Sequence, residues 1–427
     1  MAEEESGNSP AWEAVGTCPQ CGAKVEVEVG DRVLSCRYCK TSLYIVQDGP
    51  LGYRLPVVDE FRGEEIIYLP FWRLKGLRYK VFSETGEVEA HLLDSTAPAT
   101  SLLPEGVSLG VRPQAWQLTL TNWPKNTPQT DIPVEKAIDG SAVDKVFGVR
   151  VDQLMSRLIG ETAVIVHAPF ALREEGEKVC LREAFPDGRQ YCLTQGEAGA
   201  LKEALGKAGN HAPMRFLPLI CPNCAGALPP DHGAEVLLCP NCAKAWWTRG
   251  EKFGEMPFAL LGELGEGQRL FPFWQLDFSA ESIGLKSRAD LALWATPYRI
   301  TPKEWGSDNC SALIPGFKIK SKIFLRLGKI ATLFFTGEHG PPRPEKGKIN
   351  AEPVRLSLKE AVEALPVILS SMVMDKKNRL PLIATTEFRI LRARLLYIPF
   401  ALERREWRHQ PSGQVIPENV LIYGANL

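Results

Sequence analysis

The sequence predicts an α+β fold made of two tandem copies of one unit, a small four-cysteine module followed by a mainly antiparallel β domain with one or two helices. The first observation is a pair of Cys-x-x-Cys motifs, separated by 14 residues, that occurs twice: Cys18, Cys21, Cys36 and Cys39, then Cys221, Cys224, Cys239 and Cys242. Each cysteine of the second set lies 203 residues after its counterpart. Other short matches follow in the same order with slowly growing offsets, as loop insertions in a duplicated unit would produce.

Two of these matches lie outside the cysteine modules. Residues 69–74 (LPFWRL) match 271–276 (FPFWQL), and the letters PFAL occur at both 169–172 and 399–402. Aromatic residues that follow a proline at the start of a strand usually pack in a core. We therefore expect core packing at these positions, with a docking groove in each copy as the alternative.

The chain divides by composition into six expected segments. They are a disordered acidic tail (1–16), a first cysteine module (17–47), a first α+β domain (51–195), a helical linker (196–215), a second cysteine module (216–249) and a basic second α+β domain (251–427).

Local patterns predict the main elements within these segments. β-Branched and aromatic runs predict strands at 66–74, 115–121, 162–167 and 386–398. Short helices are expected at 134–146 and 151–158, and good helix formers predict a longer one at 197–207. The Ser-x-x-Glu sequence from Ser357 to Glu360 predicts a capping box, in which the two side chains satisfy free amides of the first helical turn.

Composition is that of an ordinary globular protein, with 44% hydrophobic and 24% charged residues in a chain of 427. The first residues are acidic and lack the apolar stretch of a secretory signal. The longest uncharged apolar run, 364–374, is shorter than the roughly 20 residues that span a bilayer. We expect a cytoplasmic protein with no membrane span.

Eight of the 11 cysteines belong to the Cys-x-x-Cys pairs, which in a reducing cytosol indicate thiolate metal ligands. The other three, Cys180, Cys192 and Cys310, have no Cys or His nearby at ligand spacing, so we expect them to be small buried apolar residues. A Cys-x-x-Cys turn places two sulfurs on one side of a tight bend, and two such turns complete a tetrahedral site. Four thiolates favour Zn²⁺ or a mononuclear iron.

The two modules resemble the zinc-ribbon superfamily, the class found at the front of transcription factor IIB. The resemblance covers about 30 residues in each copy and implies two structural Zn²⁺ ions, one held by Cys18, Cys21, Cys36 and Cys39 and the other by Cys221, Cys224, Cys239 and Cys242. Rubredoxins share this turn geometry with iron, but Gly usually follows their second Cys-x-x-Cys, where this chain has Lys40 and Ala243. Iron and a redox disulfide are the alternatives to zinc.

A tetrathiolate site leaves no open position for substrate, so its role is structural. The sequence contains no phosphate-binding glycine loop in a strand–helix context and no His-Glu-x-x-His motif. An enzyme whose site is assembled from distant residues stays a third hypothesis. The sequence favours a non-enzymatic zinc-binding adaptor or scaffold that binds another cytoplasmic protein.

A nucleic-acid-binding accessory protein is the second hypothesis. Basic residues outnumber acidic ones about two to one in residues 311–410, whereas the cysteine modules are close to neutral. Lys318, Lys320 and Lys322 alternate with apolar residues, so we expect them on one face of a strand, with Arg389, Arg392 and Arg394 on a neighbouring strand. This surface would bind a polyanion, or it would be an ordinary solvated sheet face.

Overall fold

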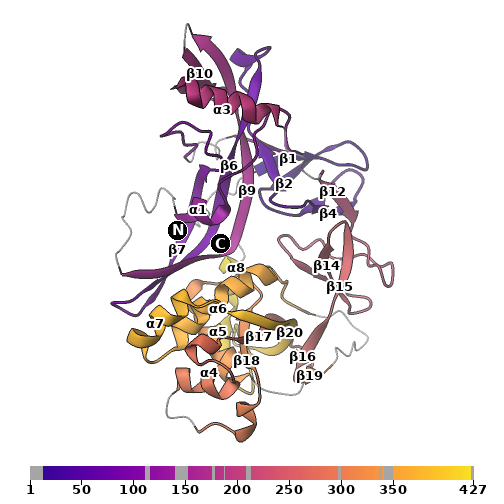
Figure 1. The fold of residues 1–427 in the computed structure, drawn as a ribbon. Helices are drawn as coiled ribbons and strands as arrows, with labels where there is room; N and C mark the ends of the chain where they lie inside the picture. The colour runs from indigo at the N-terminus through magenta and orange to yellow at the C-terminus, as the bar shows by residue number, and fades with distance from the viewer. Residues whose placement is uncertain are drawn as a thin grey trace, which may run out of the picture. The chain divides into compact units, whose positions relative to one another are not determined.

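The computed structural model of this chain describes residues 13–110, 116–139, 152–175, 178–186, 188–207, 213–296, 300–335, 339–340 and 350–424. Strands predominate, and seven α-helices lie within these residues, so the fold is mixed α+β as expected (Figure 1). None of the helices in the described part of the chain combines the length and apolar character needed to cross a lipid bilayer.

The chain forms two compact units that are described separately. Unit 1 comprises Met1–Lys75, Leu93–Gly148 and Thr162–Leu219, and unit 2 comprises Gly76–Leu92, Val149–Glu161 and Ile220–Leu427. The sequence-based division placed residues 76–92 and 149–161 in the first α+β domain, but they belong to unit 2. Strands β6, β7 and β9 are long enough to run from one unit into the other, which local sequence patterns do not reveal.

Unit 1 is built on a sheet with strand order β11-β10-β9-β5-β8-β1-β2, in which β6 pairs with β9 and β7. A second, three-stranded sheet has the order β12-β4-β3. The strands are β1 (Glu13–Thr17), β2 (Lys24–Glu28), β3 (Val33–Ser35), β4 (Ser42–Val46), β5 (Gly52–Arg54), β6 (Ile66–Phe82), β7 (Val88–Pro98), β8 (Leu118–Leu120), β9 (Gln153–Glu175), β10 (Lys178–Glu183), β11 (Gln190–Leu193) and β12 (Arg215–Pro218), and the helices are α1 (Val134–Asp139) and α3 (Gln195–Gly206).

Unit 2 contains a sheet with the order β18-β17-β20-β16-β19, to which β21 and β22 are added through β20, and a three-stranded sheet β13-β14-β15. Helices α5 and α6 pack on each other and against β18 (Figure 1). The strands are β13 (Val236–Leu238), β14 (Ala245–Arg249), β15 (Lys252–Met256), β16 (Phe258–Leu261), β17 (Arg269–Ser279), β18 (Cys310–Pro315), β19 (His339–Gly340), β20 (Arg389–Glu403), β21 (Glu406–His409) and β22 (Gln414–Pro417), and the helices are α4 (Arg288–Ala295), α5 (Ser321–Phe334), α6 (Leu358–Met372), α7 (Lys376–Thr385) and α8 (Glu418–Gly424).

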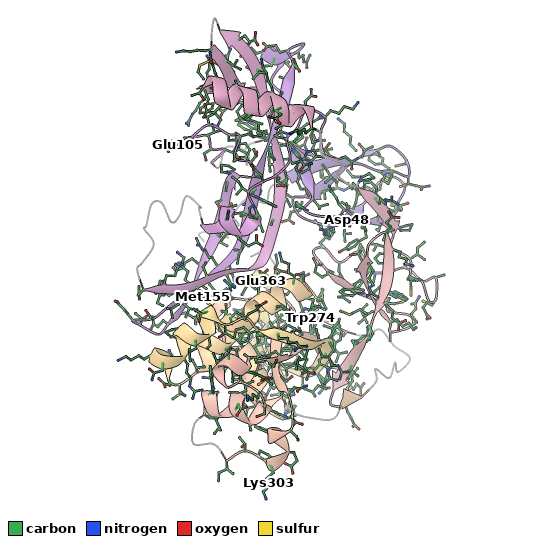
Figure 2. All side chains as sticks on the ribbon, in the orientation of Figure 1. Asp48, Glu105, Met155, Trp274, Lys303 and Glu363 are labelled. Carbon is green, nitrogen blue, oxygen red and sulfur yellow. A yellow bond between two sulfur atoms is a disulfide. The ribbon has the colours of Figure 1, made fainter. Side chains whose placement is uncertain are left out.

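The repeated Pro-Phe-Trp segments lie in the cores. Trp274 of β17 is buried among the side chains of unit 2 (Figure 2), and its Nε1 donates a hydrogen bond of 2.8 Å to the Leu356 carbonyl. In unit 1, Trp72 of β6 donates in the same way to the Ile132 carbonyl, also at 2.8 Å. Each indole thus satisfies its polar atom while burying its rings, which identifies both residues as packing elements.

Helix starts follow the sequence patterns closely. Ser357 caps α6 with both hydrogen bonds of the predicted capping box. Thr194 and Glu197 form a second capping box at the start of α3, the helix expected at 197–207. Side-chain capping depends on residues three positions apart, so local sequence is sufficient to predict it.

Three predictions of local structure are wrong. The expected helix at 151–158 is instead the start of β9, where pairing with β6 outweighs a short helical pattern. The expected disordered tail overlaps β1, because Glu13–Thr17 pairs with β2; residues 1–12 lie outside the described residues. Residues 317–323 do not form a strand, since α5 begins at Ser321.

Candidate metal centres

Each half of the first metal site is a tight turn closed by backbone hydrogen bonds. In the first turn, the Cys18 amide donates to the Ala23 carbonyl at 2.8 Å, and the Gly22 amide donates to the Cys18 carbonyl at 2.8 Å. Gly22 has a φ of +74°, a left-handed conformation that glycine adopts without steric cost. The turn geometry holds Cys18 and Cys21 on the same side, as the spacing predicts.

The second module repeats this backbone arrangement 203 residues later. The Cys221 amide donates to the Gly226 carbonyl and the Ala225 amide to the Cys221 carbonyl, at 2.8 and 2.9 Å. Strand pairing also repeats, since β3 and β4 pair Leu34 with Leu43, and β13 and β14 pair Leu237 with Trp246. The left-handed residues recur at the same offset: Gly22, Gly30 and Lys40, then Ala225, Gly233 and Ala243.

The sulfur atoms of each cluster are spaced as a tetrathiolate ion site requires. Within each group of four, the Sγ atoms all lie within 4.8 Å of one another. The shortest separations are 3.7 Å (Cys18–Cys39), 3.6 Å (Cys21–Cys36), 3.6 Å (Cys221–Cys242) and 3.6 Å (Cys224–Cys239). A tetrahedron with Zn–S bonds of about 2.3 Å has edges of about 3.8 Å. Each cluster could therefore hold a metal ion such as zinc.

Burial within each cluster follows one pattern. The first and third cysteines, Cys18 and Cys36, are buried, the second is exposed and the fourth is intermediate, and the second module has the same order. The Thr41 hydroxyl lies 3.4 Å from Cys39 Sγ, and hydrogen bonding by this hydroxyl and the Thr41 backbone lowers the pKa of Cys39 to about 6. A thiol that loses its proton near neutral pH is prepared for metal binding.

Comparisons with protein-family models, curated proteins and solved structures give no match to this chain. The argument about function therefore depends on the geometry of the sites. In the described part of the chain, the two cysteine clusters are the groups of three or more potential ligands close enough to bind one metal ion.

The two modules differ in the strand that precedes the first cysteine pair. In module 1, β1 pairs with β2 along five residues, from Glu13 opposite Glu28 to Thr17 opposite Lys24. In module 2 the equivalent pairing shrinks to a single bridge between Ile220 and Ala227. The residues that would extend it are Pro229 and Pro230, which cannot donate to a β-ladder.

The strand before module 2 pairs elsewhere. β12 adds to the edge of β4 in module 1, with Arg215 opposite Val46 and Pro218 opposite Leu43. The Leu219 amide continues the ladder by donating to the Ser42 carbonyl at 3.1 Å. Module 1 therefore completes its three-stranded sheet with a strand about 170 residues away in sequence. In module 2 the third strand is β15, which follows directly after β14.

The predicted polyanion-binding residues do not form one strand face. Lys318 and Lys320 precede α5, and Lys322 lies in its first turn, whereas Arg389, Arg392 and Arg394 all lie in β20 as expected. Arg394 donates through Nε to Gln275 Oε1 at 2.5 Å, so it already belongs to a polar network on the sheet. Binding of a polyanion by these six residues stays a prediction.

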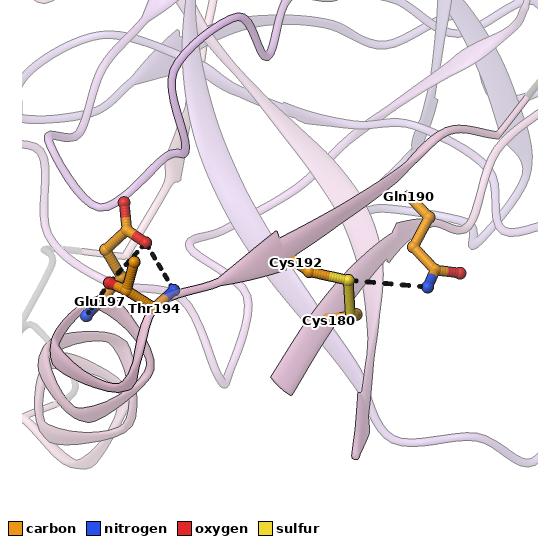
Figure 3. The surroundings of a disulfide bond; sticks show 5 residues. All are labelled: Cys180, Gln190, Cys192, Thr194 and Glu197. Atoms are coloured by element: carbon orange, nitrogen blue, oxygen red, sulfur yellow. Dashed lines mark hydrogen bonds between the residues drawn. A yellow bond between two sulfur atoms is a disulfide. The ribbon is translucent and has the colours of Figure 1, made fainter. Parts of the chain in front are cut away.

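The expectation for two of the unclustered cysteines is wrong. Cys180 and Cys192 form a disulfide across the antiparallel pair β10 and β11, where the two residues are directly opposite (Figure 3). Their separation of 12 residues resembles no ligand spacing, so the strand register was the missing information. Cys310 is buried as expected, with its Sγ 3.0 Å from the Ser287 carbonyl, and burial raises the pKa of its thiol to about 12.

Proposed function

We propose that this protein is a non-enzymatic zinc-binding scaffold, in which two ribbon modules derived from an internal duplication hold extended protein segments in place. The observation that carries the proposal is β12, which module 1 binds as an added strand along β4. Strand addition to a sheet edge is a common mode of peptide recognition, because main-chain hydrogen bonds supply affinity for many sequences.

The ligand sets support a structural role for the ions. Four cysteines provide all four positions of a tetrahedral zinc site, so water and substrate have no position at which to bind. A domain of about 30 residues has too small a core to fold alone, and zinc supplies the missing stability. Zinc binding would then decide whether β4 is available as a docking edge.

The repeated geometry supports the duplication. Turn hydrogen bonds, strand register and left-handed residues recur at a constant offset of 203, and the Trp72 and Trp274 hydrogen bonds recur in the β domains. Two copies with different third strands are what a scaffold could use to treat an internal segment and an external partner differently.

The direct test is metal analysis followed by capture of partners. Protein purified under reducing, chelator-free conditions should contain close to two zinc ions per chain. Tagged full-length protein should retain a protein partner at a fixed stoichiometry after nuclease treatment, and the complex should form again from the two purified components. Cys21→Ser should weaken it, whereas Ser35→Ala, in the same module but outside the ligand set, should not.

Two outcomes would contradict the proposal. A metal content near zero would remove the zinc-binding basis. Isolation of the chain as a lone monomer, or with nucleic acid that nuclease removes, would reject a protein scaffold; in the second case, binding lost at high salt would favour the accessory protein that uses the basic residues of the C-terminal region.

A further inference from the structure

A polar cavity of about 320 Å³ lies within unit 2, away from the cysteine clusters in sequence and in its lining. Its volume is at the lower end of the range for small-molecule sites. Its floor is the sheet β18-β17-β20, and residues at the start of α4 and the end of α5 complete the wall. Packing of the sheet against helices leaves this one region lined by hydrogen-bonding side chains.

Strand register arranges the floor in rows of increasing polarity. The innermost row pairs Phe273 with Leu396, and the next row places Gln275 between Leu313 and Arg394. The outer row places Asp277 opposite Ser311, while Asp308 and Asn309 at the rim are exposed. A ligand bound here would have an apolar end on the inner row and a charged end at the outer rows.

A hydrogen-bond network fixes the polar side chains of the floor. The Gln275 amide nitrogen donates to Ser311 Oγ at 2.9 Å and to Asp277 Oδ1 at 3.3 Å, while its oxygen accepts from Arg394 Nε at 2.5 Å. Burial lowers the pKa of Arg394, the nearby Arg392 lowers it further, and Asp277 opposes both. An anionic group beside Arg394 would replace part of the hydration that this guanidinium has lost.

The charges in the lining balance. Arg288 and Arg394 supply two cations, and Asp277 and Asp308 supply two anions. Arg288 is oriented by the ring of Trp305, which lies 4.1 Å from its guanidinium carbon. A purely anionic ligand would meet two carboxylates and a purely cationic ligand two guanidinium groups, so a ligand with both charges fits best.

The equivalent position in unit 1 is closed by an internal ion pair. Arg73 lies at the place of Gln275 in the repeated segment, and its guanidinium pairs with Asp94 at 2.8 Å while it donates to the Leu74 carbonyl at 2.6 Å. Both charges of that site are thus supplied by the chain itself. In unit 2, neutral Gln275 stands at this position and the polar groups line a cavity.

We infer that the unit 2 cavity binds a small zwitterion with an apolar side chain, such as a free apolar α-amino acid. The carboxylate lies toward Arg394 and Arg288, the ammonium group lies toward Asp277, and the side chain lies over Leu313, Leu396 and Phe335. This inference does not depend on the scaffold function proposed above.

Calorimetric titration of the full-length, zinc-loaded protein tests this. L-Leucine and L-phenylalanine should bind, and glycine should bind more weakly because it leaves the apolar end empty. N-acetyl-L-leucine lacks the ammonium group and L-leucinamide lacks the carboxylate, so each should bind at least about tenfold more weakly than leucine. These comparisons use the natural protein and do not depend on whether a variant folds.

Matched variants locate the site. Arg394→Gln and Asp277→Asn should each weaken leucine binding about tenfold or more, whereas Arg389→Gln, the same charge change on the same strand outside the cavity lining, should leave it unchanged. The inference is overturned if no amino acid binds at millimolar concentration, if inorganic phosphate competes as well as leucine, or if Arg394→Gln and Arg389→Gln bind leucine equally.

Discussion

Cysteine serves two purposes in this chain, and the difference arises residue by residue. In the clusters, the sulfurs of Cys18 and Cys39 approach to 3.7 Å, a separation suited to sharing an ion. Cys180 and Cys192 instead form a covalent bond between neighbouring strands (Figure 3). Disulfides are rare in reducing cytosol, so this bond makes the redox state of the protein a question separate from its metal content.

Replacing both Cys180 and Cys192 with Ala should lower the free energy of unfolding of the oxidised protein by about 2–3 kcal/mol, because the bond restricts the unfolded chain across a short loop. Urea denaturation with and without a phosphine reductant would measure this. The natural protein should match the variant once reduced. Equal stability of the two under oxidising conditions would contradict the prediction.

His409 should make stability depend on pH. It is buried between Phe335 and Phe400, with Nδ1 2.7 Å from the Ser412 hydroxyl, and burial lowers its pKa to about 4. Between about pH 6.5 and 4 the unfolded chain binds the proton more readily than the folded chain, so acidification across this window should cost about 1–2 kcal/mol after allowance for solvent screening.

Denaturation at pH 4.5 and pH 7 measures that cost as a difference between the natural protein and His409→Asn. The variant should lose less stability on acidification, and protonation of the cysteine clusters cancels because both proteins contain them. His91→Asn, at an exposed position beside Glu89, is the control and should behave as the natural protein does. The same pH slope in all three proteins would refute the role of His409.

At the scale of elements, the two cysteine modules share turns and register but differ in the strand that completes each sheet. Two adjacent prolines, Pro229 and Pro230, account for the difference, because they end the hairpin that β1 and β2 form in the first module. β12 is then free to pair with β4. A change of two residues in one copy thereby links module 1 to the segment preceding module 2.

Loss of one ligand should consequently have different effects in the two modules. Cys21→Ser should unfold module 1 and expose the amides of β12 to hydrogen exchange, because their acceptors lie on β4. Cys224→Ser should unfold module 2 and leave Phe216 and Leu217 protected. Hydrogen exchange read by mass spectrometry on peptides spanning 213–219 would distinguish the two; equal deprotection would show that β12 depends on the second module.

At the scale of the whole molecule, unit 2 is assembled from three separate stretches of chain. Tyr79, Val81, Met155 and Ile159 come from the first half of the sequence and are buried in the same core as Trp274 and Phe324. The ring of Tyr79 lies 5.9 Å from that of Phe324. The core of unit 2 is therefore incomplete in a fragment that begins at residue 220.

Tyr79→Ala should cost about 3–5 kcal/mol, as expected for removal of a buried aromatic side chain, and residues 220–427 expressed alone should show the loose packing of an incomplete core. Thermal unfolding and near-ultraviolet circular dichroism would measure both. Tyr38→Ala, at a position 75% exposed, is the control and should change stability by less than about 0.5 kcal/mol. A stable, fully folded 220–427 fragment would contradict this account of the core.

The sequence by itself determined the features that depend on short spacings. Cys-x-x-Cys turns, the capping box at Ser357 and the alternation of Val25 and Val27 with charged residues each involve neighbours a few positions apart, and the structure forms them as expected. The repeat of these features at one offset also predicted two similar clusters. Local geometry is sufficient for such features because the interacting groups are close in the chain.

Only the tertiary structure decided which distant segments meet. The Cys180–Cys192 bond, the pairing of β12 with β4, the Arg394–Gln275 network and the place of Tyr79 in the core of unit 2 all depend on strand register or on long-range packing. Register is set by burial summed over whole strands, and a shift of one residue would turn each side chain to the opposite face. A local pattern contains no information about that sum.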